Sequence, residues 1–475
     1  MGDPRARQDR AVQDTRVRLA PAGDPGDGAG EGPRLDGLRI AMINWREPGQ
    51  REAGGAEEYA WRMSRELAAR GAAVSFITSR EPQQRRAEHR DGLRVRRMGG
   101  TYSRYPLVLL YLVARRLLGR RPFHVVIDSM NGIPFFSPLA LPRRTHVFCL
   151  VHHVHEQQFS VYLPGWLAAF GRFLERRVAS RIYRRHAAVA VSPSTAATMR
   201  DRLGWRGPIF VVPNGTPAVG DRGDRAPDGD PALISVGRLV AHKRMDRVVE
   251  LTGELAPRWP GLRTHIVGRG VEHDRLAAAA AERGLADRVE LHGYVSGADR
   301  NALLAGATLN VTASRFEGWG LTVLEAAALG VPTVACDVDG LKDAVREGET
   351  GWLAASPAEL AAVTEAALKE LSDPLRRAEI SAACVRWASR FTWADSGARM
   401  ARLIVAERAA PPRRRAGGRA YVAELGDGRA VLDEDTDPGR LHRSVTRIFD
   451  GHGGEVTIRP ATALEVLTGR AETSR

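Results

Sequence analysis

The sequence alternates between short apolar runs and longer stretches with helical spacing. In the first such unit, Leu38–Asn44 is an apolar run, and Tyr59, Met63 and Leu67 recur at i, i+4 and i+8, as on one face of a helix. Val74–Thr78 is the next apolar run. A strand, a helix and a second strand in this order form a βαβ unit, in which the strands are parallel and the helices cover the sheet.

The alternation continues in two arrays of similar size, separated by residues 216–231, which are rich in Gly, Pro and Asp. Further strands are predicted at 124–128, 146–151, 187–191 and 209–212 in the first array, and at 232–236, 264–267, 289–292, 308–311 and 333–335 in the second. We therefore predict an α/β chain with two Rossmann-like domains, each a doubly wound parallel sheet, that face a cleft. Ligands of such sheets bind beyond the carboxyl ends of the strands, so the cleft is the expected active site.

The predicted organisation has five parts. Residues 1–37 form a disordered leader, 38–215 the first domain, 216–231 a linker and 232–408 the second domain. Residues 409–475 form a C-terminal extension to which the sequence assigns no role. Within it, residues 421–432 and 455–467 suit a small hairpin or helix.

Positive charge is concentrated in the first domain. The chain has a net charge of +14, and residues 38–215 alone hold 29 basic and 12 acidic side chains. Such a surplus is typical of proteins that bind nucleic acid or an anionic membrane, but no nucleic-acid recognition motif is present. Nearly all the cations are arginines, and the three lysines are Lys243, Lys342 and Lys369. A lysine is therefore more informative here than an arginine.

Cysteine usage and hydropathy predict a cytoplasmic protein. The three cysteines are far apart and form no CxxC pair, which favours a reducing compartment over a disulfide framework. The first residues lack the apolar core of a signal peptide. The longest apolar run, Leu107–Ala114, is far shorter than the roughly 20 residues that span a bilayer.

Three loops at predicted strand ends carry candidate binding residues. The first contains Gly54 and Gly55, ahead of the first helix, where backbone N–H groups can approach a phosphate. Its spacing is not GxGxxG, so a glycine-rich loop without a ligand remains an alternative. The second runs from Gly237 through Arg238 to Lys243, two cations suited to a diphosphate. A solvated arginine is the alternative for Arg238.

The third loop separates Glu317 from Glu325 and contains a Gly-aromatic-Gly sequence. Gly318, Trp319 and Gly320 lead into a helix predicted to begin at Leu321 and to stop at Gly330. The loop amides can hold a phosphate, while the two carboxylates can bind hydroxyl groups of a ribose and of a sugar ring. The alternative is a surface glutamate together with one that stabilises a helix N-terminus.

These motifs resemble those of family 4 of the retaining glycosyltransferases, which have the GT-B fold. The resemblance covers about residues 38–408. It depends on the E-x7-E element at 317–325, the GRL-x3-K element at 237–243, the segment VPNG at 212–215 and the segment IVGRG at 266–270, all in the family's order.

The resemblance implies a role for each motif residue. Arg238 and Lys243 would bind the donor diphosphate and stabilise its charge as it leaves. Glu325 would hold the ribose, Glu317 would contact the donor sugar, and the amides of Gly318, Gly320 and Leu321 would touch the distal phosphate or the sugar. Gly237 would shape the diphosphate loop, and Gly54 and Gly55 would bring the first domain against the phosphates or the acceptor.

A histidine that follows a strand of the first domain completes the family pattern. Of His152, His153 and His155, the pair His155-Glu156 fits best, so that His155 would hydrogen-bond the donor sugar. His152 and His153 stay open as alternatives. Two departures, Arg244 after the GRL-x3-K element and the segment DGLKD at 339–343, suggest a distinct donor sugar.

The resemblance implies a retaining transfer of a sugar from a nucleotide-diphosphate sugar to an acceptor hydroxyl, with no cofactor and no metal ion. The pair Asp337 and Asp339 reads as DxD, the metal signature of a different transferase fold, but here it follows a strand of the second domain. A GT-B sugar-nucleotide epimerase and a pyridoxal-phosphate phosphorylase are alternative enzymes. A basic nucleic-acid- or membrane-binding protein is the alternative of another class.

Two stretches of the first domain, Tyr105–Arg121 and Trp166–Arg185, combine apolar residues at helical spacing with arginines. A basic amphipathic helix can lie on an anionic membrane surface. The alternative is a helix that packs on its own sheet with its arginines in water. A helix at the membrane surface predicts an anionic or lipid-linked acceptor and a protein at the inner face of the membrane. We expect no nucleic-acid partner.

Overall fold

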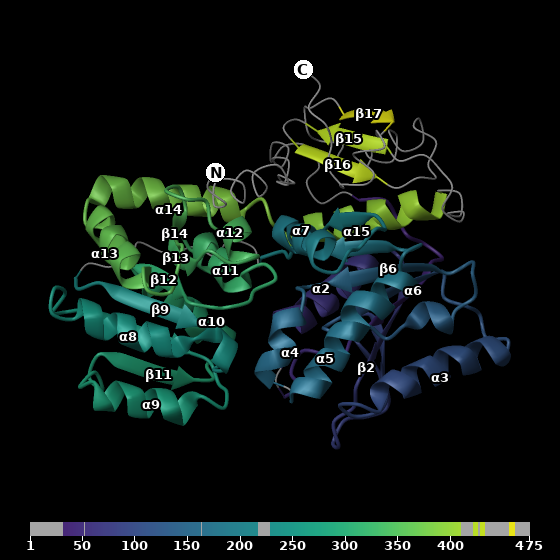
Figure 1. The fold of residues 1–475 in the computed structure, drawn as a ribbon, viewed down its shortest axis with the longest axis horizontal. Coiled ribbons are helices and arrows are strands. Elements are labelled where there is room, and N and C mark those ends of the chain that lie inside the picture. The colour runs from purple at the N-terminus through teal and green to yellow at the C-terminus, as the bar shows by residue number, and fades with distance from the viewer. Residues whose placement is uncertain are drawn as a thin grey trace, which may run out of the picture. The chain divides into compact units, whose positions relative to one another are not determined.

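The computed structural model describes residues 32–51, 53–162, 164–216, 229–409, 421–425, 428–432 and 456–460. Their contacts divide the chain into two compact units, and Figure 1 shows the elements of each. Unit 1 contains the residues up to Pro213 and those from Ala394 onward, and unit 2 is Asn214–Trp393. The linker expected at 216–231 and the leader expected at 1–37 lie largely outside the described residues.

Unit 1 is built on an eight-stranded sheet with the strand order β3-β4-β2-β1-β5-β6-β7-β8. Its strands are β1 (Arg39–Ile43), β2 (Ala73–Thr78), β3 (Ala87–Arg90), β4 (Leu93–Arg97), β5 (Val125–Met130), β6 (His146–Val151), β7 (Ala187–Ala190) and β8 (Ile209–Val211). All neighbours pair in parallel except β3, which is antiparallel to β4 at one edge. Buried runs such as β5 follow from helices on both faces of the sheet. The sequence analysis missed the β3–β4 hairpin.

The helices of unit 1, apart from the last, connect successive strands of its sheet. They are α2 (Gly55–Ala69), α3 (Arg104–Leu117), α4 (Glu156–Tyr162), α5 (Gly165–Phe173), α6 (Ser180–Ile182), α7 (Pro193–Asp201) and α15 (Trp393–Ala409). A π-helical turn, Leu174–Ala179, joins α5 to α6. Among the described residues, no helix is both long and apolar enough to cross a bilayer.

Helix α15 packs on unit 1, although it follows unit 2 in the sequence. Arg70 of α2 donates a hydrogen bond from Nη2 to the carbonyl oxygen of Ala394 at 2.8 Å. Gly397 and Ala398 lie directly against Glu66 and Gly32, closely enough that a methyl group at either glycine would clash. The expected second domain, 232–408, therefore ends near Trp393 instead, because the last helix buries its apolar face on the first unit.

Unit 2 is built on a six-stranded, fully parallel sheet with the order β11-β10-β9-β12-β13-β14. Its strands are β9 (Ala232–Val236), β10 (Arg263–Val267), β11 (Val289–Gly293), β12 (Leu309–Thr312), β13 (Thr333–Cys336) and β14 (Gly351–Ala354). Its helices are α8 (Met245–Leu255), α9 (His273–Glu282), α10 (Gly297–Gly306), α11 (Leu321–Ala328), α12 (Leu341–Ala344), α13 (Leu360–Leu371) and α14 (Pro374–Ala388). The sequence analysis missed β14.

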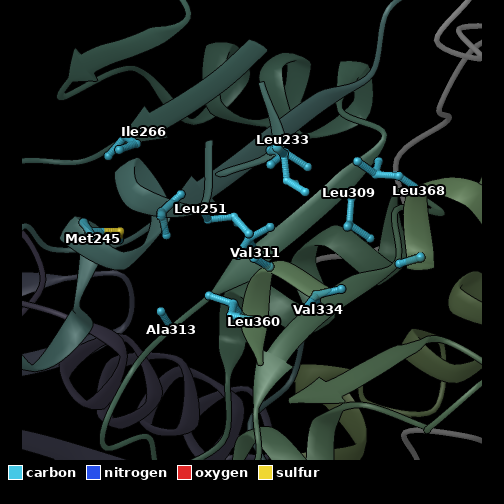
Figure 2. Packing of buried hydrophobic residues seen from close by; sticks show 14 of the residues in the cluster. Leu233, Met245, Leu251, Ile266, Leu309, Val311, Ala313, Val334, Leu360 and Leu368 are labelled. Carbon is cyan, nitrogen blue, oxygen red and sulfur yellow. The ribbon is translucent and has the colours of Figure 1, made fainter. Parts of the chain in front are cut away.

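The main core of unit 2 lies between its sheet and the helices α8, α9 and α13. Figure 2 shows Leu233, Val311 and Val334, from three neighbouring strands, close to Leu251 of α8 and Leu360 of α13. These side chains are fully or almost fully buried. Burial of an aliphatic side chain of this size contributes about 1.5–3 kcal/mol, so this layer fixes the strand ends that carry the candidate site.

The described part of the C-terminal extension contains a small antiparallel sheet. Strands β15 (Tyr421–Leu425) and β16 (Gly428–Leu432) form a hairpin, and β17 (Val456–Pro460) pairs with the other edge of β15. Of the hairpin or helix considered for residues 421–432, the structure has the hairpin, and residues 455–467 contribute a strand where they are described.

Candidate functional site

The loop that follows β9 is shaped by close contact with the loop that follows β10. A Cβ atom at Gly268 would lie 1.8 Å from the carbonyl oxygen of Gly237, and the Gly268 φ of +144° suits glycine. The N–H of Gly237 donates to the carbonyl oxygen of Val267 at 2.9 Å, and that of Leu239 donates to Arg269 at 3.0 Å. The glycines of the IVGRG segment thus let this backbone hold the loop of Gly237 in place.

Lys243 ends a three-ten turn, Ala241–Lys243, and forms an ion pair with Glu317. The same carboxylate oxygen, Oε1, accepts a hydrogen bond from Ser314 Oγ at 3.3 Å. Both side chains of the ion pair are 18% exposed, so they are accessible to a ligand yet sheltered from bulk water. Arg238 is half-buried and precedes Lys243 on the same loop. Two motifs that are 74 residues apart are therefore joined.

The loop before α11 is held by a buried tryptophan and a second glycine contact. Trp319 is 2% exposed, and its ring meets that of Phe391 edge-on at 5.1 Å. A Cβ atom at Gly340 would lie 2.5 Å from the carbonyl carbon of Gly318. Gly320 has a φ of +87° and caps the helix, which begins at Leu321 as predicted. The first amides of α11 are thereby fixed, with the positive end of the helix dipole beside them.

Glu325 lies on α11 and is paired with a residue that the sequence analysis missed. Arg300 of α10 places Nη2 3.2 Å from Glu325 Oε1, and the two side chains are 31% and 15% exposed. No motif marks this arginine, since arginine is common throughout the chain and only the packing of α10 brings it to α11. Each of the two motif glutamates is therefore matched with one cation.

In unit 1 the glycine loop ahead of α2 is held by the side chain of Glu57, the third residue of that helix. The N–H of Gly54 donates to Glu57 Oε2 at 2.7 Å, while Glu57 Oε1 accepts from Trp45 Nε1 at 2.7 Å. Gly55 is the first helical residue. The sequence suggested that the N–H of Gly54 could bind a phosphate. In the structure this N–H donates to a carboxylate of the protein instead.

The three histidines after β6 have different surroundings. His152 is buried, its ring meets Tyr59 edge-on at 5.2 Å, and burial lowers its pKa to about 3. His153 and His155 are half-buried, with stacked rings whose centroids are 3.8 Å apart. His152 therefore stays neutral as part of the core, whereas His155 has access to solvent.

Glu175 lies beneath His155 and was also missed by the sequence analysis. Its Oε1 accepts the backbone N–H of His155 at 2.7 Å and lies 3.9 Å from Nδ1 of the same residue. The carboxyl group is fully buried within the π-helical turn, and this burial raises its pKa to about 8. The sequence does not show that Glu175 is buried, because it stands among arginines and only the π-helical turn directs its side chain inward.

In the described part of the chain, the DxD pair belongs to no group of side chains that could hold a metal ion. Asp339 forms an ion pair with Lys342 at 3.0 Å, and Asp337 is exposed. Within the described ranges, the group of side chains that is close enough to hold a metal ion is His265, Glu290 and His292, on β10 and β11.

Comparison with known proteins identifies both halves of the chain. Residues 53–218 match the family model described as Glycosyltransferase Family 4, and residues 221–385 match that of Glycosyl transferases group 1. The chain belongs to glycosyltransferase family 4. The resemblance seen in the motifs is thereby confirmed.

A curated relative and two solved structures illustrate the similarity of this family 4 chain. The GDP-mannose-dependent alpha-(1-6)-phosphatidylinositol monomannoside mannosyltransferase of Mycolicibacterium smegmatis is 32% identical over 234 residues, covering 46% of this chain and 54% of that enzyme. The chain spans about half or less of the first curated relatives, 38–54% of their lengths.

The sucrose-phosphate synthase of Thermosynechococcus elongatus has a TM-score of 0.67 at 22% identity, covering 78% of this chain and 99% of that one. The Anabaena protein HepE in complex with UDP-glucose has a TM-score of 0.58 at 16% identity, with the same coverage. These structures establish the GT-B fold for the family 4 chain.

Proposed function

We propose that the chain is a retaining glycosyltransferase that moves a sugar from a nucleotide-diphosphate sugar to an acceptor hydroxyl. The observation that carries the proposal is the meeting of the GRL-x3-K loop with the E-x7-E loop through Lys243 and Glu317. The named relatives favour transfer over epimerisation, since the Mycolicibacterium enzyme is a mannosyltransferase and the Anabaena structure contains UDP-glucose.

In the proposed reaction the donor diphosphate binds to Arg238, Lys243 and the first amides of α11. These groups stabilise the negative charge that develops as the bond to the sugar breaks, and they are held in place before the reaction by the loop contacts described above. Glu325 binds the ribose diol, and Glu317 accepts a hydrogen bond from a sugar hydroxyl. The acceptor attacks from the face that the nucleotide leaves, and its proton passes to the leaving phosphate. The family pattern implies that His155 hydrogen-bonds the donor sugar.

A thermal-shift panel with UDP-, GDP-, ADP- and dTDP-sugars tests the donor site. One donor class raises the melting temperature of the wild-type chain, because a ligand that binds only the folded state stabilises that state. The same donor has little effect on Glu325→Ala, which lacks the carboxylate that binds the ribose. The absence of a shift with every donor would contradict the assignment. Conversion of the donor sugar or release of free nucleotide without an acceptor would favour the epimerase.

We further propose that the acceptor is anionic or lipid-linked. Arg104 of α3 is 2% exposed, and its guanidinium lies 4.5 Å from the ring centroid of Trp45 and 5.0 Å from that of Tyr105. Burial lowers its pKa, and a hydrogen bond with Tyr105 and the charge of Glu57 only partly offset this effect. A buried cation with no closely paired carboxylate among the described residues favours a negatively charged ligand. The acceptor named for the Mycolicibacterium relative is a phosphatidylinositol mannoside.

Two helices of unit 1 would bring the chain to the cytoplasmic face of an anionic bilayer. Apolar side chains at helical spacing are exposed on both helices. Helix α3 also carries three arginines, and α5 carries one, Arg172. On α3 and the residue after it the exposed apolar side chains are Leu107, Leu110, Val113, Leu117 and Leu118, and on α5 they are Trp166, Phe170 and Phe173. This arrangement suits a basic helix at a membrane surface. The buried free cysteines agree with a reducing compartment.

Co-sedimentation with lipid vesicles tests the membrane contact. Vesicles with anionic lipid should bind the wild-type chain better than neutral ones, and Trp166→Ser with Phe170→Ser should weaken binding. Leu375→Ser is the matched control, since Leu375 is 78% exposed on α14 of unit 2. Binding that is independent of anionic lipid, or that is equally weakened in the control, would argue against the proposal.

A further inference from the structure

Three side chains at the edge of the unit 2 sheet bring potential metal ligands together. His265 lies on β10, while Glu290 and His292 lie two residues apart on the edge strand β11. Residues i and i+2 of a strand share a face, and His265 is directly paired with Glu290 across the two strands. The three side chains therefore project from one face of the sheet. They are half-buried or exposed, with 18%, 45% and 22% of the side chain accessible in the order of the sequence.

A β-bulge interrupts the pairing of β10 with β11 at His292. Ile266 is paired with Leu291, but the next residue of β10, Val267, is paired with Gly293, so that His292 has no partner on β10. Gly293 adopts a φ of +63° directly after it. Bulges between parallel strands are rare and commonly redirect a side chain at a functional position.

The three ligand atoms have the separations that a small divalent cation requires. His265 Nδ1 lies 3.0 Å from His292 Nε2 and 3.5 Å from Glu290 Oε2, and the last two atoms are 3.6 Å apart. A circle through three points at these separations has a radius of about 2.0 Å. This radius matches the zinc–nitrogen and zinc–carboxylate distances of about 2.0–2.2 Å. An ion near the centre of the triangle would thus contact all three atoms without a rearrangement.

The second carboxylate oxygen of Glu290 has a different neighbour. Arg263 Nη1 lies 3.7 Å from Glu290 Oε1, the oxygen that is not directed at the histidines. An arginine in this position orients the carboxylate and leaves Oε2 for a metal ion. Residues that contact the ligands of a metal site commonly have this role.

We propose that His265, Glu290 and His292 form a binding site for a divalent transition-metal ion such as Zn²⁺. Two imidazoles and one carboxylate suit zinc and do not suit Mg²⁺, which prefers oxygen ligands. Three protein ligands leave at least one coordination position for water or a further ligand. The ion would cross-link the edge strand β11 to β10. This site is independent of the proposed sugar transfer, which needs no metal ion.

Equilibrium dialysis of the untagged full-length chain against zinc, followed by competition with a chromophoric chelator, measures the affinity. We expect saturable binding with a dissociation constant below about 10 µM, undisturbed by millimolar Mg²⁺. His265→Ala and His292→Ala should each weaken the affinity of this site by about 100-fold or more, and Glu290→Gln by about 10-fold or more. His273→Ala is the matched control, because His273 is a partly exposed histidine of the same unit whose Nδ1 lies 3.0 Å from Asp274.

A second measurement follows thermal unfolding with and without zinc. Zinc should raise the melting temperature of the wild-type chain and of His273→Ala, and it should do so much less for the site variants. Glu290→Gln keeps the experiment decisive if a histidine variant fails to fold, since Glu290 is 45% exposed on an edge strand. Absence of saturable binding below about 100 µM, or equal zinc binding by wild type and Glu290→Gln, would overturn the proposal.

Discussion

Lys243 and Glu317 form an ion pair between the three-ten turn after β9 and the loop before α11. In the proposed reaction both residues also contact the donor, Lys243 through the diphosphate and Glu317 through the sugar. The pair therefore holds each side chain close to the place where it acts. Such advance positioning reduces the reorganisation that accompanies charge development in the transition state.

Replacement of Lys243 by alanine should lower the rate of sugar transfer by about 10²–10³-fold, because a cation aimed at the leaving diphosphate is lost. Initial rates with the donor found in the thermal-shift panel measure the effect. Lys369→Ala is the matched control, since Lys369 Nζ pairs with Glu365 at 2.9 Å on α13 and is 67% exposed. Equal rates for the wild type and Lys243→Ala would remove Lys243 from the mechanism.

Replacement of Glu325 by glutamine should weaken donor binding by about 10–100-fold, because hydrogen bonds from the ribose hydroxyls to a charged carboxylate are worth about 1.5–3 kcal/mol. Arg300→Ala should weaken binding in the same direction, since Arg300 holds that carboxylate at 3.2 Å. Calorimetric titration with the donor measures both effects. Glu254→Gln, an exposed position on α8, should leave the affinity unchanged. Wild-type affinity in Glu325→Gln would exclude the ribose contact.

Replacement of Gly340 by alanine should destabilise unit 2 by about 1–3 kcal/mol, because φ is +80° and the new methyl carbon would lie 2.5 Å from the carbonyl carbon of Gly318. Denaturant unfolding measures the loss. At Gly306, the last residue of α10, a Cβ atom has no heavy atom within 4 Å. Gly306→Ala should therefore change the stability by about 0.5 kcal/mol or less. A similar stability for the two variants would mean that the Gly318–Gly340 contact is not tight.

The buried carboxyl group of Glu175 should make the folded state less stable as the pH rises. Its pKa is about 8 in the fold and near 4.5 when exposed, so between these values the folded chain binds the extra proton. Stability is therefore lost between about pH 4.5 and 8, by up to about 1.4 kcal/mol per pH unit. Glu175→Gln should remove this part of the slope.

Urea unfolding at pH 5, 6.5 and 8 measures the effect of Glu175. Asp201→Asn, at the exposed end of α7, should keep the slope of the wild type. If Glu175→Gln retains the full wild-type slope, the carboxyl group is ionised in the fold and the raised pKa is wrong.

Local patterns in the sequence were sufficient for the two parallel sheets and for the motif loops. Continuous apolar runs such as β5 predict strands that are buried on both faces. The loops of Gly237 and Gly318 follow strands directly in the sequence, so their place at the carboxyl edge of the sheet could be predicted. The start of α11 at Leu321 was predicted as well, because Gly320 stands just before it.

The remaining features depend on contacts between distant segments. An apolar helix face shows that α15 must be buried, but only the packing of Gly397 against Glu66 places it on unit 1. The Arg300–Glu325 ion pair requires α10 to lie beside α11. The inward direction of Glu175 requires a π-helical turn.

The sequence by itself thus determined the alternation of strands and helices in each array, the class of fold and the family. The tertiary structure decided which charged groups meet, which carboxyl group is buried, and how closely His292 approaches His265 beside the bulge of β11. The physical reason is that side-chain periodicity records only which face of an element is buried. The partner of that face is decided when all the elements pack together.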